Sequence, residues 1–231
     1  MLSLDANAVA LNTNIHLSGG AISATARLGD ITLGDNARLD VAGITQNFDR
    51  EKVASAGGDI ALSAVAGDVI TSSGSVMDVS GSALSDTQGS RAGSIDISAV
   101  QGDALLQGVM RGDALADIEG GEIAVDAKSV GAVDALLTGI NTGAFTGAIN
   151  VRQREGNIAI GETQTVTAHD IRLVADAGDV TVAARLDASG SKGGRIDIAA
   201  GNNAVLQSGA RLDANATSAD GRGGKVFIGS R

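Results

Sequence analysis

The sequence of 231 residues predicts an all-β fold, a right-handed parallel β-helix in which each coil contributes three short strands. We expect residues 1–231 to form one segment of such a solenoid. Three observations carry this prediction: a strand motif that recurs along the chain, two further motifs that follow it at set distances, and a composition suited to stacked strands. One repeat of this kind cannot bury its apolar face alone, whereas stacked repeats can.

The first motif is Gly-Gly followed by alternating polar and aliphatic residues, as in Gly57–Leu62 (GGDIAL). A period of two turns Ile60 and Leu62 to one face of the strand and Asp59 and Ala61 to the other. Eight such strands start at residues 21, 59, 94, 122, 148, 170, 195 and 225. If equivalent strands of successive coils pair in register, one interior column contains Ile22, Ile60, Ile95, Ile123 and Ile196.

Two further motifs complete each repeat. A Gly-Asp or Gly-Asn step comes nine residues after the first strand position, as from Asp59 to Asp68, and supplies a corner. An aliphatic-Asp-aliphatic run usually lies ten residues further on, as at Met77–Val79. We expect its aliphatic residues, Leu39, Met77, Leu186 and Leu212, to stack in one interior column. Its aspartates, Asp40, Asp78, Asp187 and Asp213, should then point outward.

The composition fits stacked strands and excludes several functions. There are 33 Gly but no Pro, Cys, Trp or Tyr, and the net charge is −10. The absence of Pro suits continuous strand ladders, because Pro lacks the amide donor. Thiol catalysis, disulfides and Cys-based metal sites are excluded, and we expect no cofactor. An acidic chain almost without aromatic rings is unsuited to nucleic acid. No apolar run approaches the roughly 18 residues of a membrane helix, so we expect no membrane span.

The repeat is interrupted in two ways. Insertions near residues 44–56, 82–92 and 215–222 follow the third motif, which predicts a row of loops along one edge. The least regular stretch, Val130–Gly147, contains Val133–Gly139, which resembles Gly102–Gly108 with its Asp displaced. We expect a bulged or enlarged turn there, which would absorb the displacement of the Asp. No segment of the chain sustains a helical pattern for three turns.

The combination of Gly-Gly-x-Ile-x-Leu, Gly-Asp-Val and Leu-Asp-Val resembles the filamentous-haemagglutinin-like exoproteins of bacterial two-partner secretion. It is clearest over Gly57–Gly81 and Asp170–Arg195. The resemblance implies a non-enzymatic shaft segment of a longer secreted protein, exported through an outer-membrane β-barrel transporter and serving adhesion at the cell surface through an unidentified receptor. The Asn-Pro motifs of that family's secretion domain are absent, so the secretion signal itself is not carried over.

The rival hypothesis is a glycan-active β-helix enzyme of the polysaccharide lyase or hydrolase type. Outward carboxylates such as Asp40, Asp78 and Asp213 would supply its acidic pair, although residues that recur in every coil are more simply solvated strand ends. We expect His16 on a strand face and His169 in a turn, neither in a catalytic triad.

One tripeptide matches a recognition motif. Arg111-Gly112-Asp113 spells the integrin-binding sequence and is our candidate adhesive site. Asp113 lies ten residues after Asp103, which in register is the place that Asp40 occupies, so the repeat by itself explains the aspartate.

Overall fold

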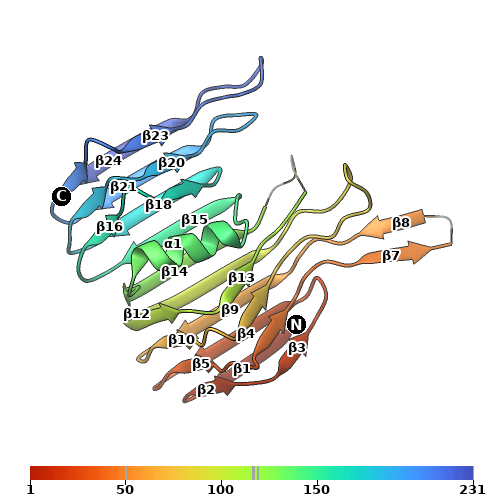
Figure 1. The fold of residues 1–231 in the computed structure, drawn as a ribbon. Helices are drawn as coiled ribbons and strands as arrows, with labels where there is room; N and C mark the ends of the chain where they lie inside the picture. Colours follow the sequence, from red (N-terminus) through yellow and green to blue (C-terminus); the bar gives the residue numbers. More distant parts are fainter. Residues whose placement is uncertain (50, 116–117, 119, 231) are drawn as a thin grey trace.

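The computed structural model describes residues 1–49, 51–115, 118 and 120–230. The protein is all-β, with 50% of its residues in strands and 4% in a helix, and its sheets are mostly parallel. Strands are stacked in sequence order from the N-terminal to the C-terminal end (Figure 1). In most repeats one longer strand is followed by two shorter strands that pair with different neighbours.

The longer strands form one continuous parallel sheet, which we call the long sheet. Its nine strands pair in the order β1 (Leu2–Ala6), β4 (Ala21–Ala26), β9 (Asp59–Ala64), β12 (Ser94–Leu106), β14 (Glu122–Ser129), β15 (Ala148–Gln153), β18 (Asp170–Ala175), β21 (Arg195–Ala200) and β24 (Lys225–Ser230). The first-motif strands starting at 21, 59, 94, 122, 148, 170, 195 and 225 are therefore confirmed as strands.

The pairing register confirms the predicted isoleucine column. Ile22 pairs with Ile60, Ile60 with Ile95, and Ile95 with Ile123. The column then continues through Ile149 and Ile171 to Ile196. These side chains are buried, and such close-packed β-branched residues suit a narrow interior between sheets. The alternation of the first motif thus fixes which face of the long sheet is covered.

The shorter strands form separate parallel ladders on each side of residues 133–142. On the N-terminal side, β2 (Val9–Leu11), β5 (Ile31–Leu33), β10 (Val69–Thr71) and the second half of β12 pair in that order. Beside them run β3 (Asn14–His16), β6 (Arg38–Asp40), β11 (Val76–Asp78) and β13 (Val109–Arg111). On the C-terminal side, one ladder has the order β16 (Ile158–Ile160), β19 (Val180–Val182) and β22 (Ala204–Leu206), and the other has the order β17 (Thr165–Thr167), β20 (Arg185–Asp187) and β23 (Arg211–Asp213).

The predicted single column of Leu39, Met77, Leu186 and Leu212 is wrong. Leu39 pairs with Met77 in one sheet and Leu186 pairs with Leu212 in another. The helix α1 (Val133–Thr142) lies between these two sheets, in contact with β13 on one side and with β16 and β17 on the other. Its presence divides the third-motif strands into two groups.

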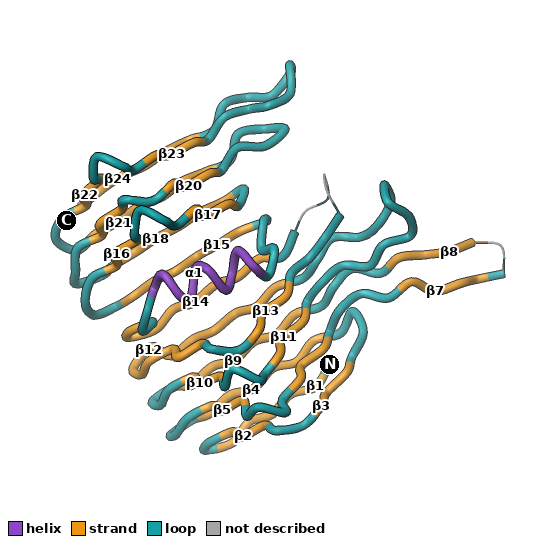
Figure 2. The backbone as a smooth tube through the Cα atoms, in the orientation of Figure 1, coloured by secondary structure: helices purple, strands orange, loops and turns teal. Residues whose placement is uncertain are grey.

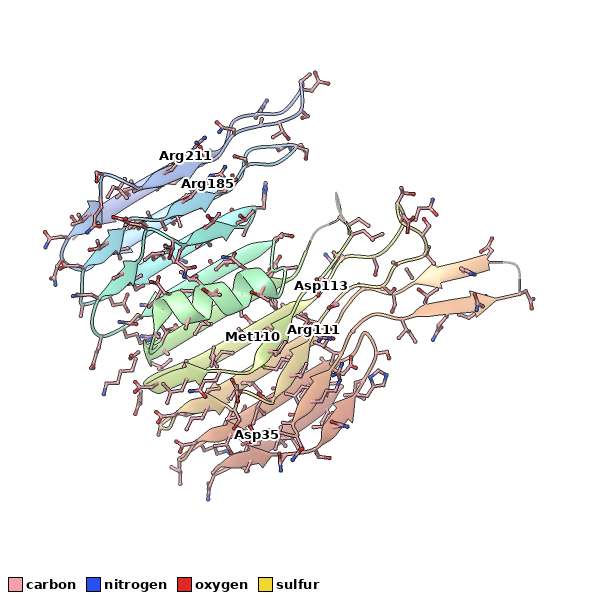
Figure 3. All side chains as sticks on the ribbon, viewed as in Figure 1. Asp35, Met110, Arg111, Asp113, Arg185 and Arg211 are labelled. Carbon is pink, nitrogen blue, oxygen red and sulfur yellow. The ribbon has the colours of Figure 1, made fainter. Side chains whose placement is uncertain are left out.

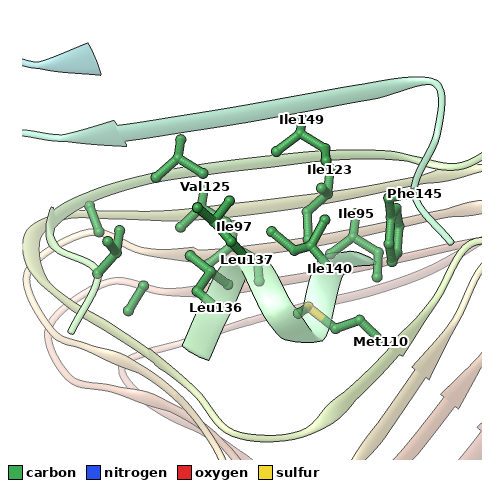
Figure 4. Packing of buried hydrophobic residues seen from close by; sticks show 14 of the residues in the cluster. Ile95, Ile97, Met110, Ile123, Val125, Leu136, Leu137, Ile140, Phe145 and Ile149 are labelled. Carbon is green, nitrogen blue, oxygen red and sulfur yellow. The ribbon is translucent and has the colours of Figure 1, made fainter. Parts of the chain in front are cut away.

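Helix α1 also overturns the expectation of a bulged turn within Val130–Gly147. Its apolar residues Val133, Leu136, Leu137 and Ile140 are buried, at the i, i+3, i+4, i+7 spacing of a helix face. Two turns of this pattern suffice because the neighbouring strands supply the rest of the apolar surface (Figure 4).

The corners explain the recurring Gly and Asp. A Cβ atom on Gly58 would overlap the carbonyl oxygen of Gly20 in the preceding repeat, so the stacked backbone leaves room only for glycine. At the next corner, the Asp30 carboxylate accepts the Asp68 N–H at 2.9 Å, and the Asp68 carboxylate accepts the Asp103 N–H at 2.7 Å. Each Asp therefore satisfies a backbone donor of the following repeat.

The loops after the third strands project from the same side of the sheets (Figures 1 and 2). Residues 44–56 contain an antiparallel hairpin, β7 (Thr45–Phe48) and β8 (Glu51–Ala54). The hydroxyl of Thr45 donates to the carbonyl of Ala83 at 2.9 Å, which ties this hairpin to the loop 82–92. In the C-terminal group, the Ser218 hydroxyl of loop 215–222 donates to the Ser191 carbonyl at 2.6 Å.

Candidate functional site

The tripeptide Arg111-Gly112-Asp113 lies at the end of β13, next to the loop side of the molecule (Figure 3). The prediction that Asp113 occupies the place of Asp40 is wrong. Asp40 pairs with Asp78, and Asp78 pairs with Arg111. Ala104 pairs with Val69, and Val109 pairs with Val76. Fewer residues separate Ala104 from Val109 than separate Val69 from Val76, so the connection between the second and third strands is shorter in this repeat. Asp113 therefore falls beyond the strand.

The backbone of the tripeptide is held on both sides. Gly112 donates its N–H to the Gly143 carbonyl at 2.7 Å and accepts the Gly121 N–H at 2.8 Å. Asp113 accepts the Gly81 N–H at 2.8 Å and donates its own N–H to the Ser80 hydroxyl at 3.3 Å. A Cβ atom on Gly112 would lie 2.8 Å from the buried Phe145 ring, so packing requires this glycine. The motif is an anchored strand end rather than the tip of a loop.

The outer side chains of the tripeptide join different neighbours. Arg111 is 49% exposed and its guanidinium lies 3.8 Å from the Asp78 carboxylate. The Asp113 side chain is exposed beside it. Since alternate residues of an extended chain share a face, Arg111 and Asp113 project to the same side. This arrangement presents one cation and one anion, with the cation already paired.

Arg111 belongs to a row of charges along β3, β6, β11 and β13. His16 lies 3.3 Å from Asp40, and Arg38 lies 3.7 Å from Asp40 and 3.9 Å from Asp78. The second carboxylate oxygens close the strands, because Asp40 accepts the Ala42 N–H at 3.2 Å and Asp78 accepts the Ser80 N–H at 3.1 Å. These aspartates therefore shape the strand ends, which explains their recurrence without catalysis.

A second charge row follows β20 and β23 in the C-terminal part (Figure 3). Arg185 lies 2.7 Å from Asp187 and 3.0 Å from Asp213, and Arg211 lies 2.7 Å from Asp213. The hydrogen bond from Arg211, followed by that from Arg185, lowers the pKa of Asp213 below its usual value. Asp78 and Asp213 lie outside the apolar core but are buried by these contacts, so the expectation of solvated aspartates is wrong for them.

The repeated tripeptide Arg-Leu-Asp marks these rows in the sequence. It stands at Arg38–Asp40, Arg185–Asp187 and Arg211–Asp213, and each copy forms a third strand. The Asp of this motif was among the residues predicted to face outward, whereas no role was predicted for the Arg. Arg two residues before Asp on an extended strand is the signal that would have predicted the ion pairs, because both side chains share a face.

The outer face of the long sheet carries further paired charges. Arg27 donates two hydrogen bonds to Asp5, which lower the pKa of that carboxyl group. Arg154 donates two hydrogen bonds of 2.8 Å to Asp126, from its Nε and Nη2 atoms to the two carboxylate oxygens. Arg195 donates to Asp197 at 2.8 Å and lies 5.1 Å from the centre of the Phe227 ring. These contacts distribute over several strands and do not converge on one centre.

Several shallow depressions lie on this face among the described residues. One of about 290 Å³ is lined by Asp59, Arg91, Ser94 and Glu122, and the Ser94 hydroxyl donates to Asp59 at 2.9 Å. Another depression of about 440 Å³ is lined mostly by polar and charged residues of β14, β15, β18 and β21. They are Glu122, Ala148, Asn150, Asp170, Ile171, Arg172, Arg195 and Asp197. Their carboxylates and guanidinium groups can hydrogen-bond to a polar ligand.

His16 and His169 are the two histidines of the chain. His16 is on strand β3 as predicted, and His169 directly precedes β18. Within residues 1–49, 51–115, 118 and 120–230, no group of three or more His, Asp or Glu side chains is placed to hold a metal ion. In the same described part of the chain, no helix is both long and apolar enough to cross a membrane. Comparisons with protein-family models, with curated proteins and with solved structures found no match.

Proposed function

We propose that this chain is a non-enzymatic shaft segment of a secreted bacterial surface exoprotein similar to filamentous haemagglutinin. In this proposal the chain is a right-handed parallel β-helix with three short strands per coil. It reaches the cell surface through an outer-membrane β-barrel transporter and there projects or mediates adhesion.

The observation that carries the proposal is the register of the long sheet. Nine strands pair in parallel from β1 to β24, and equivalent residues of successive repeats face each other at every step. Stacked repeats of this kind depend on contacts between neighbours, so length can be added without changing the rest. A structure that extends by repetition suits the task of holding a distal part away from a surface.

The chemistry of the charged groups supports the same proposal. Asp40 and Asp78 each bind a backbone N–H as well as an arginine, and Asp30 and Asp68 connect one repeat to the next. Groups with these structural duties recur because the repeat recurs. A catalytic carboxyl group, in contrast, usually occupies one special environment.

Secretion tests the proposal directly. The chain is fused behind the secretion domain of a two-partner exoprotein and expressed with and without the matching transporter. We expect export only with the transporter, measured by protease accessibility on intact cells. A compact cytosolic domain fused at the same place serves as the blocked control. Retention of the chain under conditions that export a known shaft segment would contradict the proposal.

The glycan-active alternative rests on the depression beside Asp59, Ser94 and Glu122. Two carboxylates in one depression are the arrangement that glycoside hydrolysis requires. The purified chain is incubated with neutral and acidic polysaccharides, and new reducing ends and unsaturated products are measured. We expect none. Cleavage that disappears in Glu122→Gln would establish the enzyme alternative and contradict the proposal that the chain is a non-enzymatic shaft segment.

The adhesive tripeptide is tested by substitution of its acidic residue. Because Gly112 is required by the Phe145 ring, replacing it would confuse loss of fold with loss of binding. Asp113→Glu leaves the backbone unchanged and lengthens the side chain by one methylene. We expect cell attachment to surfaces coated with the chain to remain the same, as in the loop control Asp220→Glu. Attachment lost in Asp113→Glu alone would establish the tripeptide as the adhesive site.

A further inference from the structure

Helix α1 stands where neighbouring repeats have two short strands. The long sheet continues past it, because β14 pairs with β12 on one side and with β15 on the other. The short-strand ladders do not continue: they end at β12 and β13 before the helix and begin again at β16 and β17 after it. Across this repeat the two parts of the molecule are therefore joined by the long sheet and by the helix (Figure 1).

Side chains of the helix replace part of the missing backbone ladder. The Asn141 amide donates to the carbonyl of Thr165 and accepts the Thr167 N–H at 3.3 Å, as a peptide group of a paired strand would. The Asp134 carboxylate accepts the Gly161 N–H at 3.1 Å. Most of these bonds lie at exposed positions, where water competes for the same groups.

The helix has little stability of its own. It has 10 residues, and a helix of that length is marginal in water without packing. Ala132 precedes it and makes no side-chain cap. Gly139 lies in its interior, where glycine is among the least favourable residues. At its end the Ala144 and Phe145 N–H groups bind the Asn141 and Ile140 carbonyls, and this turn holds Ala144 at φ 57°, a conformation that favours glycine.

Apolar packing is what keeps the helix in place. Leu136, Leu137 and Ile140 lie against the core with Phe145 and Met110 (Figure 4). When the helix opens, this group and the long-sheet side chains beneath it, such as Ile123 and Val125, lose part of their burial, while the pairing of β14 with β12 and β15 is kept. Opening the helix therefore exposes far less surface than unfolding the sheet.

We propose that residues 130–145 form a locally unfolding unit, which opens while the long sheet through β12, β14 and β15 stays paired. The opened state frees the edges of β13, β16 and β17 and leaves the long sheet as the connection between the two parts. The inference concerns the stability of this segment and does not depend on the shaft function.

Hydrogen exchange of the intact chain measures the opening. Under conditions where exchange reports equilibrium populations, we expect helix amides such as those of Ile140 and Asn141 to exchange at least about tenfold faster than paired amides of β12 and β15. Because β12 and β15 flank the helix repeat in the interior of the stack, fraying at the chain ends does not affect this comparison.

Three variants identify the cause. Gly139→Ala adds a Cβ whose nearest neighbour is the Met110 Cε at 3.9 Å, and Ala144→Gly relieves the left-handed backbone. Each should slow exchange in α1 by about fivefold, and α1 should still exchange faster than β12 and β15. Ala135→Gly, at an exposed helix position, should accelerate exchange in α1 by about the same factor.

The opposite outcome is equally clear. If α1 amides exchange at the same rate as those of β12 and β15 in the wild type and in all three variants, the helix opens only when the sheet unfolds. That result would overturn the proposal.

Discussion

The tetrapeptide Asp-Ala-Leu-Leu occurs twice in this chain and forms a strand in one place and a helix in the other. At Asp103–Leu106 it ends strand β12, with Ala104 buried and Leu105 exposed, which is the alternation of a strand. At Asp134–Leu137 it follows Val133, the first residue of helix α1, and Leu136 and Leu137 are both buried. Identical residues thus adopt two structures, so the decision lies in their surroundings.

The preceding residue makes the difference. Gly102 comes before the strand copy, and a Cβ atom there would overlap the Gly67 carbonyl of the preceding repeat. Val133 stands at the same place before the helix copy, where it is the first residue of α1 and is buried. A branched side chain cannot follow the close backbone path of the corner, so the chain leaves the ladder. Ile140, seven residues after Val133, then completes the apolar face of a helix.

The largest expected effect comes from removing that permissive glycine. Gly102→Ala places a Cβ against the Gly67 carbonyl and the Asp68 carboxylate, and we expect the free energy of unfolding to fall by about 3 kcal/mol or more. Gly139→Ala, in the helix region, has only the end of Met110 near its Cβ and should raise it by roughly 0.5–1 kcal/mol. Urea unfolding of both variants gives the two signs. Equal effects would show that the corner does not require glycine.

A smaller effect is expected where the helix imitates a strand. Asn141→Ala removes the amide that serves the Thr165 carbonyl and the Thr167 N–H, and we expect a loss of about 1 kcal/mol. Asn141→Asp keeps an acceptor for Thr167 but has no donor for Thr165, so it should restore only part of the loss. Thr142→Ser, one residue away, serves as the control that keeps its hydroxyl. Urea unfolding that finds Asn141→Ala unchanged would contradict the role assigned to this amide.

The same comparison shows which parts of the fold the sequence predicts. The long strands follow from local alternation and from Gly-Gly corners, so their starts could be read directly. Helix α1 could not, because Val133–Gly139 differs from the strand copy Gly102–Gly108 at only two positions, with Val133 in place of Gly102 and Thr138 in place of Gln107. The tripeptide register failed for a related reason: counting from Asp103 to Asp113 assumes a constant corner, whereas the pairing of Val76 with Val109 shows a shorter one. Local motifs predict elements, and pairing decides register.

The helix repeat also separates two charge rows that differ in geometry, which leads to the smallest expected effect. In the N-terminal row, Arg38 lies 3.7 Å from Asp40. In the C-terminal row, Arg211 lies 2.7 Å from Asp213, and its hydrogen bond lowers the pKa of Asp213 below the usual value of about 3.8. A carboxyl group with a lowered pKa in the folded state stabilises the fold above the pKa of the unfolded chain. This contribution is lost as the pH falls through the lower, folded-state pKa.

We therefore expect Asp213→Asn to lower the urea midpoint at neutral pH and to bring it toward that of the wild type as the pH falls below about 4. The convergence has a simple cause, since the wild-type carboxyl group becomes protonated and loses its charge-assisted bonds to Arg211 and Arg185. Asp220→Asn, in the exposed loop 215–222, should differ little from the wild type at either pH. A difference between Asp213→Asn and wild type that persists once the wild-type carboxyl group is protonated would assign the stabilisation to packing at β23 rather than to the charge of Asp213.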